Sequence, residues 1–256
     1  DILFSISGKP YDTLDEVIGN VGEGGRGSLR DFGVDYRQAD LLADGSFDTE
    51  RIAEVIKNEG ERIKVIFIQR SKGYLNRKTL SVDDIGRIIS FVKPLCPHAY
   101  VVVDNCYGEF LDIKEPTDVG VDVIAGSLIK NPGGGLALTG GYVAGREDLI
   151  DMIQYRMTCP GIGGECGLTF GQTRTMFQGM FQAPKVVNGA VKGAILCGKV
   201  YEKLGYEVCP KAEDTRSDII QAVQLRDPDS LVLFCQAIQA AAPIDAHVAP
   251  VPWAMP

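Results

Sequence analysis

The chain has 256 residues, of which 45% are hydrophobic and 23% are charged, and its formal net charge is -8 at neutral pH. This composition is typical of a globular protein with one large domain, or with one large and one small domain. The negative charge argues against nucleic acid or an anionic membrane as the main partner, and no apolar run approaches the roughly 20 residues of a membrane helix. The seven scattered cysteines and two histidines argue against a disulfide framework and a metal site, so we expect a reducing cytoplasm.

Segments typical of strands and of helices alternate along the first 146 residues. Short apolar runs predict strands at residues 2–7, 34–40, 64–69, 99–105, 121–127 and 140–146. Apolar residues at helical spacing predict a short helix capped by Thr13, a helix over 48–58, and a helix after the capping pattern of Ser81 and Asp84. The alternation predicts an α/β fold with a mostly parallel sheet and helices on both faces.

The pattern changes near residue 147, where long helical stretches begin. Short strands are expected at 205–210 and 218–225, and a capped helix at 227–239. We therefore expect a major domain over residues 1–190 and the beginning of a smaller α+β domain over 191–256. Because the chain opens within a predicted strand, we expect it to be an excerpt of a longer protein.

The segment GEGGRG at residues 22–27 has the spacing of a dinucleotide-binding loop. That fingerprint requires a strand before the glycines and a helix after them. Here a predicted helix precedes the loop and a short connection to a strand follows it. We therefore interpret the segment as a flexible glycine loop, and a nucleotide-binding protein is the least favoured alternative.

A carboxylate and a lysine follow two neighbouring predicted strands. Asp104 ends the apolar run VVVD, and Lys130 follows the run VDVIAGS, which ends at Ser127. One helix-bearing crossover fits between them, so both side chains could project from the carboxyl edge of one sheet, where open α/β sheets bind ligands. Taken separately, Asp104 is equally compatible with a cap or a hydrogen-bond acceptor, and Lys130 with a solvated charge.

The residues after Lys130 are Asn-Pro-Gly-Gly-Gly, which predicts a stiff turn that other atoms approach closely. A lysine held there, partly desolvated and near another cation, would lose its proton easily and attack a carbonyl carbon. Pyridoxal phosphate suits such an amine: Lys130 would form a Schiff base, and Asp104 would keep the ring nitrogen protonated. Ser127 would offer a hydroxyl to the phosphate. Tyr11 would supply an aromatic face, although an ordinary core tyrosine is the alternative.

These motifs resemble one family of pyridoxal-phosphate enzymes. DNCYGEF and AGSLIKNPGGGLALTGGYVAG are similar to the aspartate-aminotransferase fold and, more narrowly, to the methionine gamma-lyase-like family often called aluminium resistance proteins. Further similar segments are SGKPYDTLDEVIG, the GSL-x-x-FG-x-x-Y segment at 27–36, IQRSKGY, CPGIGGECG and PVPWAMP. The resemblance covers nearly the whole chain, and SLIKNPGGG is its most specific part.

The resemblance implies a seven-stranded, mostly parallel sheet in which GGYVAG is the one antiparallel strand. It implies that Lys130 carries the cofactor, that Asp104 pairs with its ring nitrogen, and that Tyr11 stacks on its ring. It also implies that Gln69 lies near the phenolic oxygen of the cofactor and that Asn105 lies close to the site, as do Tyr107 and Arg70 without a firm role. One departure weakens the place of Gln69, because the motif here is IQRS where related enzymes carry Asn-Pro.

Two further parts of the family pattern are expected outside these residues: the glycine-rich phosphate cradle and the arginine that holds the substrate carboxylate. Related enzymes are dimers or tetramers, so we expect a homodimer or homotetramer with sites completed across the interface. The free Cys106, beside Asp104, is most simply a small buried hydrophobe.

The function predicted from these residues is carbon–sulfur elimination from a sulfur amino acid. Lys130 would pass the cofactor to the substrate amine and then take the α-proton as a general base, and loss of a thiol would give an enamine and then a keto acid. Two alternatives remain open. One is a pyridoxal-phosphate aminotransferase or another lyase of the same fold. The other is a non-catalytic protein of this fold with a role in stress or metal tolerance.

Overall fold

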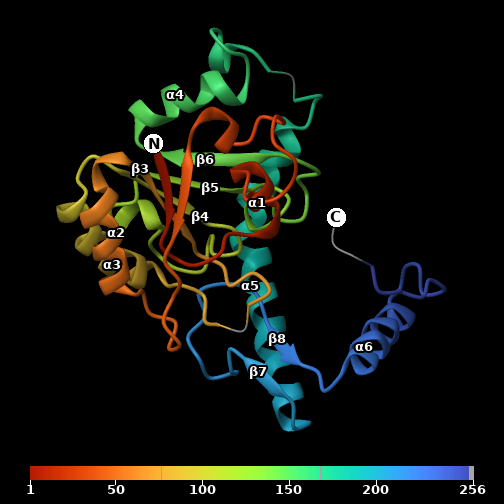
Figure 1. Ribbon diagram of the computed structural model, residues 1–256. Helices are drawn as coiled ribbons and strands as arrows, with labels where there is room; N and C mark the ends of the chain where they lie inside the picture. Colours follow the sequence, from red (N-terminus) through yellow and green to blue (C-terminus); the bar gives the residue numbers. More distant parts are fainter. Residues whose placement is uncertain (76, 168, 254–256) are drawn as a thin grey trace. The chain divides into compact units, whose positions relative to one another are not determined.

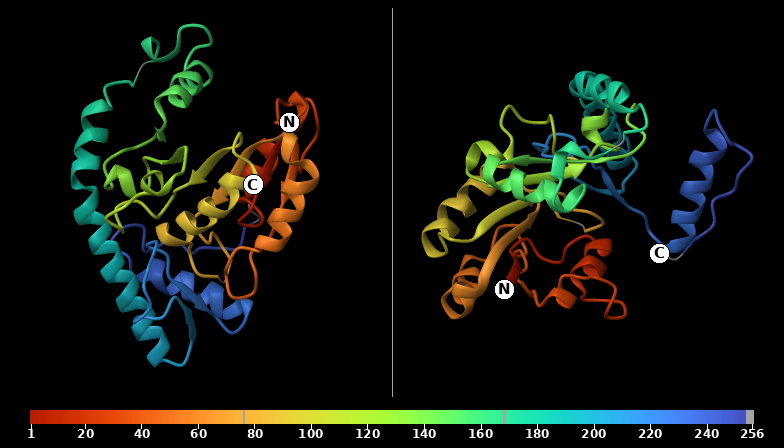
Figure 2. Two further views of the ribbon diagram at one scale, coloured as in Figure 1. Left: turned by 90° about the vertical axis from the view of Figure 1, so that its left-hand side faces the viewer. Right: turned by 90° about the horizontal axis from the view of Figure 1, so that it is seen from above.

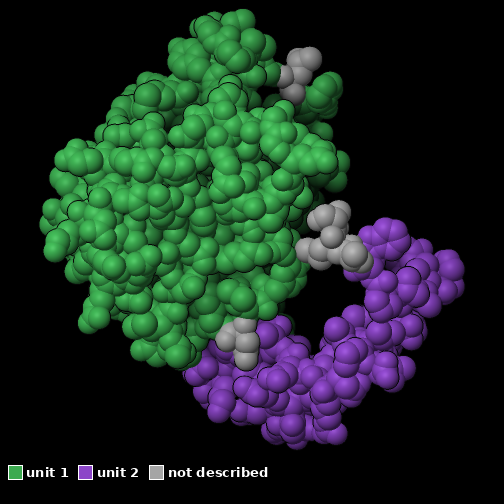
Figure 3. Space-filling model, in the orientation of Figure 1, with its two compact units in different colours: residues 1–193, 215–220 green, residues 194–214, 221–256 purple. Residues whose placement is uncertain are grey.

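A computed structural model describes residues 1–75, 77–167 and 169–253, and these residues form two compact units. One unit contains residues 1–193 and 215–220, and the other contains residues 194–214 and 221–256 (Figure 3). The division falls within one long helix, α5 (Thr173–Lys203), as does the boundary that we expected between residues 190 and 191. The units are not continuous in sequence, because the short segment 215–220 belongs to the first unit although the residues on both sides of it belong to the second.

The first unit contains a six-stranded sheet with the spatial order β2-β1-β3-β4-β5-β6. The strands are β1 (Ile2–Ser5), β2 (Asp35–Gln38), β3 (Ile63–Gln69), β4 (Tyr100–Asp104), β5 (Val123–Ser127) and β6 (Gly141–Gly145). All neighbours are parallel except β5 and β6, so the prediction of a mostly parallel sheet with GGYVAG antiparallel is confirmed (Figure 1). The prediction of seven strands is not confirmed. The described residues supply six strands to this sheet, because the chain after β6 continues as helix.

Helices cover both faces of this sheet. The α-helices of the first unit are α1 (Asp12–Ile18), α2 (Thr49–Glu59), α3 (Val82–Leu95), α4 (Glu147–Met157) and the amino-terminal part of α5. Views from two sides place α2 and α3 together on one face and α1 with that part of α5 on the other (Figures 1 and 2). Isoleucine and valine side chains of the strands pack against those of α2 and α3 and form the main core, as the alternation in the sequence predicts.

The start of α3 confirms the capping pattern read from the sequence. The Ser81 hydroxyl accepts a hydrogen bond from the Asp84 N–H, and the Asp84 carboxylate accepts one from the Ser81 N–H. Two other expectations are wrong. Helix α1 begins at Asp12, so Thr13 lies inside it and is not its cap. The crossover from β4 to β5 carries only the 3-10 turn Pro116–Val119, because the proline and the following Gly120 limit it to one turn.

A buried ion cluster joins elements at the amino end of β4 and β5. Asp122 is 5% exposed, and its carboxylate accepts hydrogen bonds from Lys93 of α3, from the Val101 N–H of β4 at 2.7 Å and from Arg146 at 3.1 Å. Burial acts to raise the pKa of Asp122, but the donated hydrogen bonds outweigh it and the pKa is lowered. This cluster stabilises the end of the sheet opposite to the predicted site.

The second unit contains the end of α5, the hairpin of β7 (Glu207–Cys209) and β8 (Ala222–Gln224), and α6 (Pro228–Ala241). The Tyr201 ring lies against the rings of Tyr206 and Phe234, with centroids 5.8 and 5.6 Å away. The Asp227 side chain caps α6 by accepting from the Ser230 N–H, as the sequence predicts. None of the helices within 1–75, 77–167 and 169–253 combines the length and the apolar character needed to cross a membrane.

Candidate functional site

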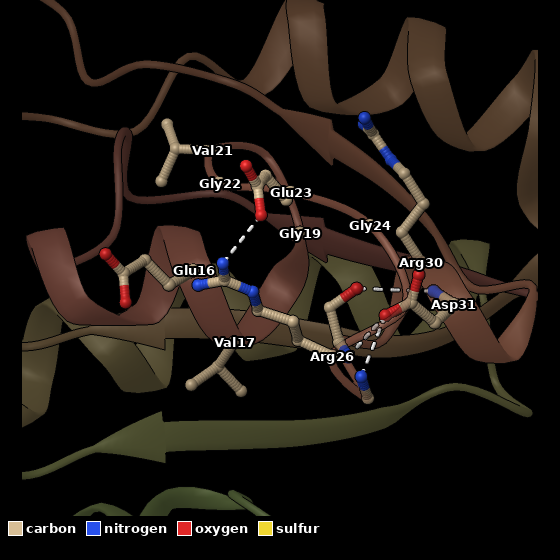
Figure 4. A pocket seen from close by; sticks show the side chains of 12 residues that line it. Glu16, Val17, Gly19, Val21, Gly22, Glu23, Gly24, Arg26, Arg30 and Asp31 are labelled. Carbon is tan, nitrogen blue, oxygen red and sulfur yellow. Dashed lines mark hydrogen bonds and ion pairs between the residues drawn. The ribbon is translucent and has the colours of Figure 1, made fainter.

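The glycine loop at residues 22–27 folds around a carboxylate of the same chain. The Asp31 side chain accepts hydrogen bonds from the backbone N–H groups of Gly25 and Gly27, each at 2.9 Å, and of Ser28 at 3.0 Å. These donors lower the pKa of Asp31 to about 2. A pocket of about 440 Å³ lies beside the loop, with Arg26 paired to Glu23 at its rim (Figure 4).

The loop follows α1 and leads through a 3-10 turn into β2, so the strand and helix of a dinucleotide site are missing around it. Two of its N–H groups, those of Gly25 and Gly27, are also already used by Asp31. Both observations agree with its interpretation as a glycine loop and give no support to nucleotide binding.

The predicted site residues gather instead at the carboxyl ends of β3, β4 and β5. Gln69, the last residue of β3, lies beside Asp104, the last residue of β4, and Asp104 lies beside Ala125 of β5. Ser127 ends β5, and Lys130 follows three residues later. This register explains why residues far apart in the sequence share one edge of the sheet.

The turn that carries Lys130 is closed by hydrogen bonds on both sides of the lysine. The Lys130 N–H donates to the Ser127 carbonyl, and the Lys130 carbonyl accepts from the Gly133 N–H, both at 3.2 Å. A Cβ atom at Gly133 would lie 1.6 Å from the Leu128 carbonyl oxygen, and one at Gly134 would lie 2.2 Å from the Gly179 carbonyl oxygen. The glycines are therefore required because the turn folds tightly on itself and because α5 packs against its backbone.

The Lys130 amine lies among aromatic and acidic groups. Its nitrogen is 4.3 Å from the centroid of the Tyr107 ring, and it also interacts electrostatically with Cys106 and Asp104. Burial acts to lower the pKa of Lys130, but these neighbours outweigh it and the pKa is raised. The expectation of a neighbouring cation and an easily lost proton is therefore wrong, because the groups around this amine are acidic.

Cys106 and Tyr107 share a short loop with Asp104. Burial, followed by the charge of Asp104, raises the pKa of the Cys106 thiol to about 12, so this cysteine is held as a neutral thiol. The Asp104 carboxylate accepts a hydrogen bond from the Cys106 N–H at 3.0 Å. Tyr107 has a φ of 70°, a conformation that is uncommon outside glycine and that is often found at functional sites.

Tyr11 is held at this edge by the loop that follows β3. Its N–H donates to the Gln69 side-chain oxygen at 2.6 Å, and the Gln69 amide donates to the Ser71 carbonyl at 3.3 Å. The Tyr11 ring lies 6.1 Å from the Tyr74 ring, and a hydrogen bond with Tyr74 is the main cause of the raised pKa of Tyr11. The nearby Tyr107 raises the pKa of Tyr11 slightly further, and the charge of Lys130 acts to lower it.

Sequence reasoning gave Tyr74 no role, although it lies in one of the motifs that carry the resemblance. Lys72 and Gly73 precede it and Leu75 follows it, and nothing in that pattern indicates that its ring reaches Tyr11. The Ser127 hydroxyl accepts from the Ile129 N–H at 3.2 Å and remains half-buried at the end of β5.

Asn105 is fully buried, and its side chain is used by the protein itself. Its oxygen accepts from Arg70 at 2.7 Å, and its nitrogen donates to Glu115 at 2.8 Å and to the Tyr142 hydroxyl at 3.3 Å. Arg70 is likewise buried, with 1% of its surface exposed, and it also donates to the Gly108 carbonyl at 3.0 Å. The structure therefore places Asn105 and Arg70 in a polar network that supports the loop after Asp104.

Comparison with known proteins identifies the family of the chain. The family model described as methionine gamma-lyase matches residues 1–256, and the chain belongs to that family. It is 49% identical over 256 residues to the uncharacterized protein YnbB of Bacillus subtilis, covering 60% of that protein. A crystal structure of a carbon-sulfur lyase involved in aluminum resistance from Clostridium novyi is 50% identical and superimposes with a TM-score of 0.94 over 99% of the chain, which covers 60% of that protein.

The chain thus spans less than two thirds of the length of these two relatives. A more distant structure, the cystathionine gamma-lyase of Lactobacillus plantarum complexed with L-serine, is 15% identical, with a TM-score of 0.66 over 91% of the chain and 59% of that protein. At this identity the likeness concerns the fold alone. It agrees with the α/β architecture expected from the sequence.

Proposed function

We propose that the protein to which this chain belongs is a pyridoxal-phosphate-dependent carbon–sulfur lyase that acts on a sulfur-containing amino acid. The observation that carries the proposal is the convergence of Lys130, Asp104 and Tyr11 at the carboxyl edge of the sheet. An amine, a carboxylate and an aromatic ring brought together there are the groups that this cofactor requires. The name of the Clostridium novyi relative supports the choice of carbon–sulfur cleavage.

The residues of the site fit the cofactor in their chemistry. Lys130 would hold the aldehyde as a Schiff base, Asp104 would pair with the ring nitrogen, Tyr11 would cover the ring, and the Ser127 hydroxyl would face the phosphate. The half-buried Asp104 carboxylate, which accepts one hydrogen bond from the Cys106 N–H, would gain a cationic partner in the protonated ring nitrogen. Gln69 would act near the phenolic oxygen and would also hold the backbone of Tyr11 in place, as its 2.6 Å hydrogen bond indicates.

When bound, the cofactor supplies an electron sink that stabilises the charge left on the α-carbon of the substrate. The side chains of this chain then have three tasks. The Lys130 amine would take the proton from the α-carbon of the substrate. Asp104 would keep the ring nitrogen protonated, and Tyr11, whose backbone is held by Gln69 and whose ring lies near Tyr74, would keep the ring plane in position.

Further parts of the proposal concern the whole protein. The substrate carboxylate would be held by an arginine outside residues 1–256, and the active form would be a homodimer or homotetramer with sites completed across the interface. We place this protein in the cytoplasm, with a small amino acid as its substrate.

The proposal is tested by thiol release. The full-length protein that contains this chain is purified, supplied with pyridoxal phosphate and incubated with thioether amino acids, and thiol and keto acid are measured together. Equal amounts of both products, lost in Lys130→Ala and retained in the control Lys114→Ala, are expected. Keto acid without thiol would show transamination instead, and cofactor binding without either product would support a non-catalytic role.

A further inference from the structure

Glu109 is a buried carboxyl group for which the proposed reaction has no use. It lies five residues after Asp104 in the same loop, and 3% of its surface is exposed. One oxygen, Oε1, accepts a hydrogen bond from the Tyr142 hydroxyl at 2.8 Å. The other, Oε2, is buried and has no hydrogen-bond partner among the described residues. A buried carboxylate in this position would be costly, because one oxygen lacks the donor that it would have in water.

Glu109 contacts the elements that carry Lys130, through its carboxyl group at β5 and through its backbone carbonyl at the turn. A Cβ atom at Gly126, next to Ser127, would lie 2.7 Å from Glu109 Oε1 and 2.5 Å from a ring carbon of Tyr142, so the side chains pack directly on the backbone of β5. The Glu109 carbonyl accepts from the Asn131 side chain at 3.1 Å, and Asn131 directly follows Lys130. Glu109 therefore contacts β5, β6 and the Lys130 turn at once.

The charged and titratable groups around Glu109 do not neutralise an ionised form. Tyr142 of β6 donates its hydroxyl, and the nearby Glu115 carries the same charge as an ionised Glu109 would. Arg70 attracts it electrostatically, but this guanidinium donates to Asn105 and Gly108 and its nearest ion pair is with Glu115, at 3.8 Å. Burial is the largest influence, and it raises the pKa of Glu109 to about 7.

We propose that Glu109 is a positioning residue that holds the Lys130 turn while it is an uncharged carboxylic acid, and that its ionisation loosens this turn. The role assigned to Lys130 rests on the proposed function, whereas the coupling between Glu109 and the turn does not. The ionised side chain, packed on Gly126 and Tyr142, gains water or a further donor only if these contacts change, and the Glu109 backbone that accepts from Asn131 would move with it. The site would therefore lose order as the pH rises from the ordinary pKa of a glutamate toward about 7, through a group that touches neither cofactor nor substrate.

The test compares the parent protein with Glu109→Gln, whose amide keeps the acceptor for Tyr142 and stays neutral. Hydrogen exchange of residues 126–136 is measured without cofactor between about pH 4 and about pH 8.5. Comparing the two proteins at each pH cancels the intrinsic pH dependence of exchange. We expect equal exchange at the acidic end and at least roughly tenfold faster exchange in the parent from neutral pH upward, since each pH unit between the ordinary pKa of a glutamate and about 7 allows up to a factor of 10.

Two controls separate positioning from a general effect on folding. Peptides from α3 should exchange alike in both proteins at every pH, and Glu115→Gln, which removes a partly exposed carboxylate of the same network, should retain the pH dependence of the parent. A ratio that does not change with pH, or a change that appears equally in α3, would overturn the proposal.

The affinity for pyridoxal phosphate is measured in the same series by visible absorbance. If the affinity of the parent relative to that of the variant decreases over the same range of pH, the order of the turn affects cofactor binding. If exchange behaves as expected and neither protein binds pyridoxal phosphate, the coupling stands and the proposed function fails. If both bind and exchange shows no pH-dependent difference, the role of Glu109 fails and the proposed function stands.

Discussion

Replacing single glycines after Lys130 by alanine should have very different costs at neighbouring positions. A Cβ atom at Gly133 would lie 1.6 Å from the Leu128 carbonyl oxygen, whereas one at Gly135 would meet nothing within 4 Å. To bring the first contact to about 3 Å, the two limbs of the Lys130 turn would have to separate by roughly 1.4 Å, a movement that the hydrogen bonds of the turn oppose.

The magnitudes follow from the two kinds of strain. Overpacking of this severity costs about 3 kcal/mol or more. Gly135 has a φ of +74°, so alanine there meets only the left-handed backbone penalty of about 1–2 kcal/mol, partly offset by the lower entropy of the unfolded chain. We therefore expect Gly133→Ala to be less stable than Gly135→Ala by about 2 kcal/mol.

Urea unfolding followed by far-ultraviolet circular dichroism measures this difference. Gly179→Ala tests the same close backbone contact from the side of α5, because its Cβ atom would lie 2.1 Å from the Gly133 carbonyl oxygen. Failure of Gly133→Ala to fold while Gly135→Ala folds agrees with the reasoning. Equal stabilities of the two variants would refute it, and with it the conclusion that the glycines serve a close backbone approach.

Two further predictions concern carboxylates away from the site. Asp122→Ala should lower the free energy of unfolding by about 3 kcal/mol, because it removes the acceptor that Asp122 provides to Lys93 and to a backbone N–H. Thermal unfolding measures this loss, with Asp148→Asn at an exposed ion pair as the control. An equal loss of stability in the two variants would contradict the prediction. For Asp31, whose pKa is lowered to about 2, the order of its glycine loop should persist above the ordinary pKa of the side chain and be lost as the pH falls toward 2. Faster amide exchange at Gly27 in Asp31→Ala, at neutral pH, checks this, and unchanged exchange would show that the carboxylate does not hold the loop.

Much of the sheet could be predicted because its signals are local. The apolar run before Asp104, the glycine-flanked run of β6 and the capping pair Ser81 and Asp84 each determine one element through short-range chemistry. The number of strands in the main sheet was taken from the resemblance and not from such a local signal, and it exceeded the six that the described residues supply to that sheet.

The surroundings of the site residues depend on contacts that sequence spacing does not reveal. The need for Gly134 arises from Gly179, 45 residues later on α5, and the raised pKa of Lys130 arises from Cys106 and Tyr107 of another loop. The burial of Glu109 was equally invisible, since a glutamate in a loop is ordinarily exposed. Candidate residues can therefore be read from motifs, whereas their ionisation requires the packed structure.

The most direct test of the central claim is to locate the cofactor on the chain. The full-length protein is incubated with pyridoxal phosphate, reduced with borohydride and digested, and the modified peptide is identified by mass spectrometry. We expect a yellow protein whose label is on Lys130, with Lys72 and Lys114 unmodified. A full-length protein that stays colourless, or that carries the label on another lysine, would contradict the assignment of this site.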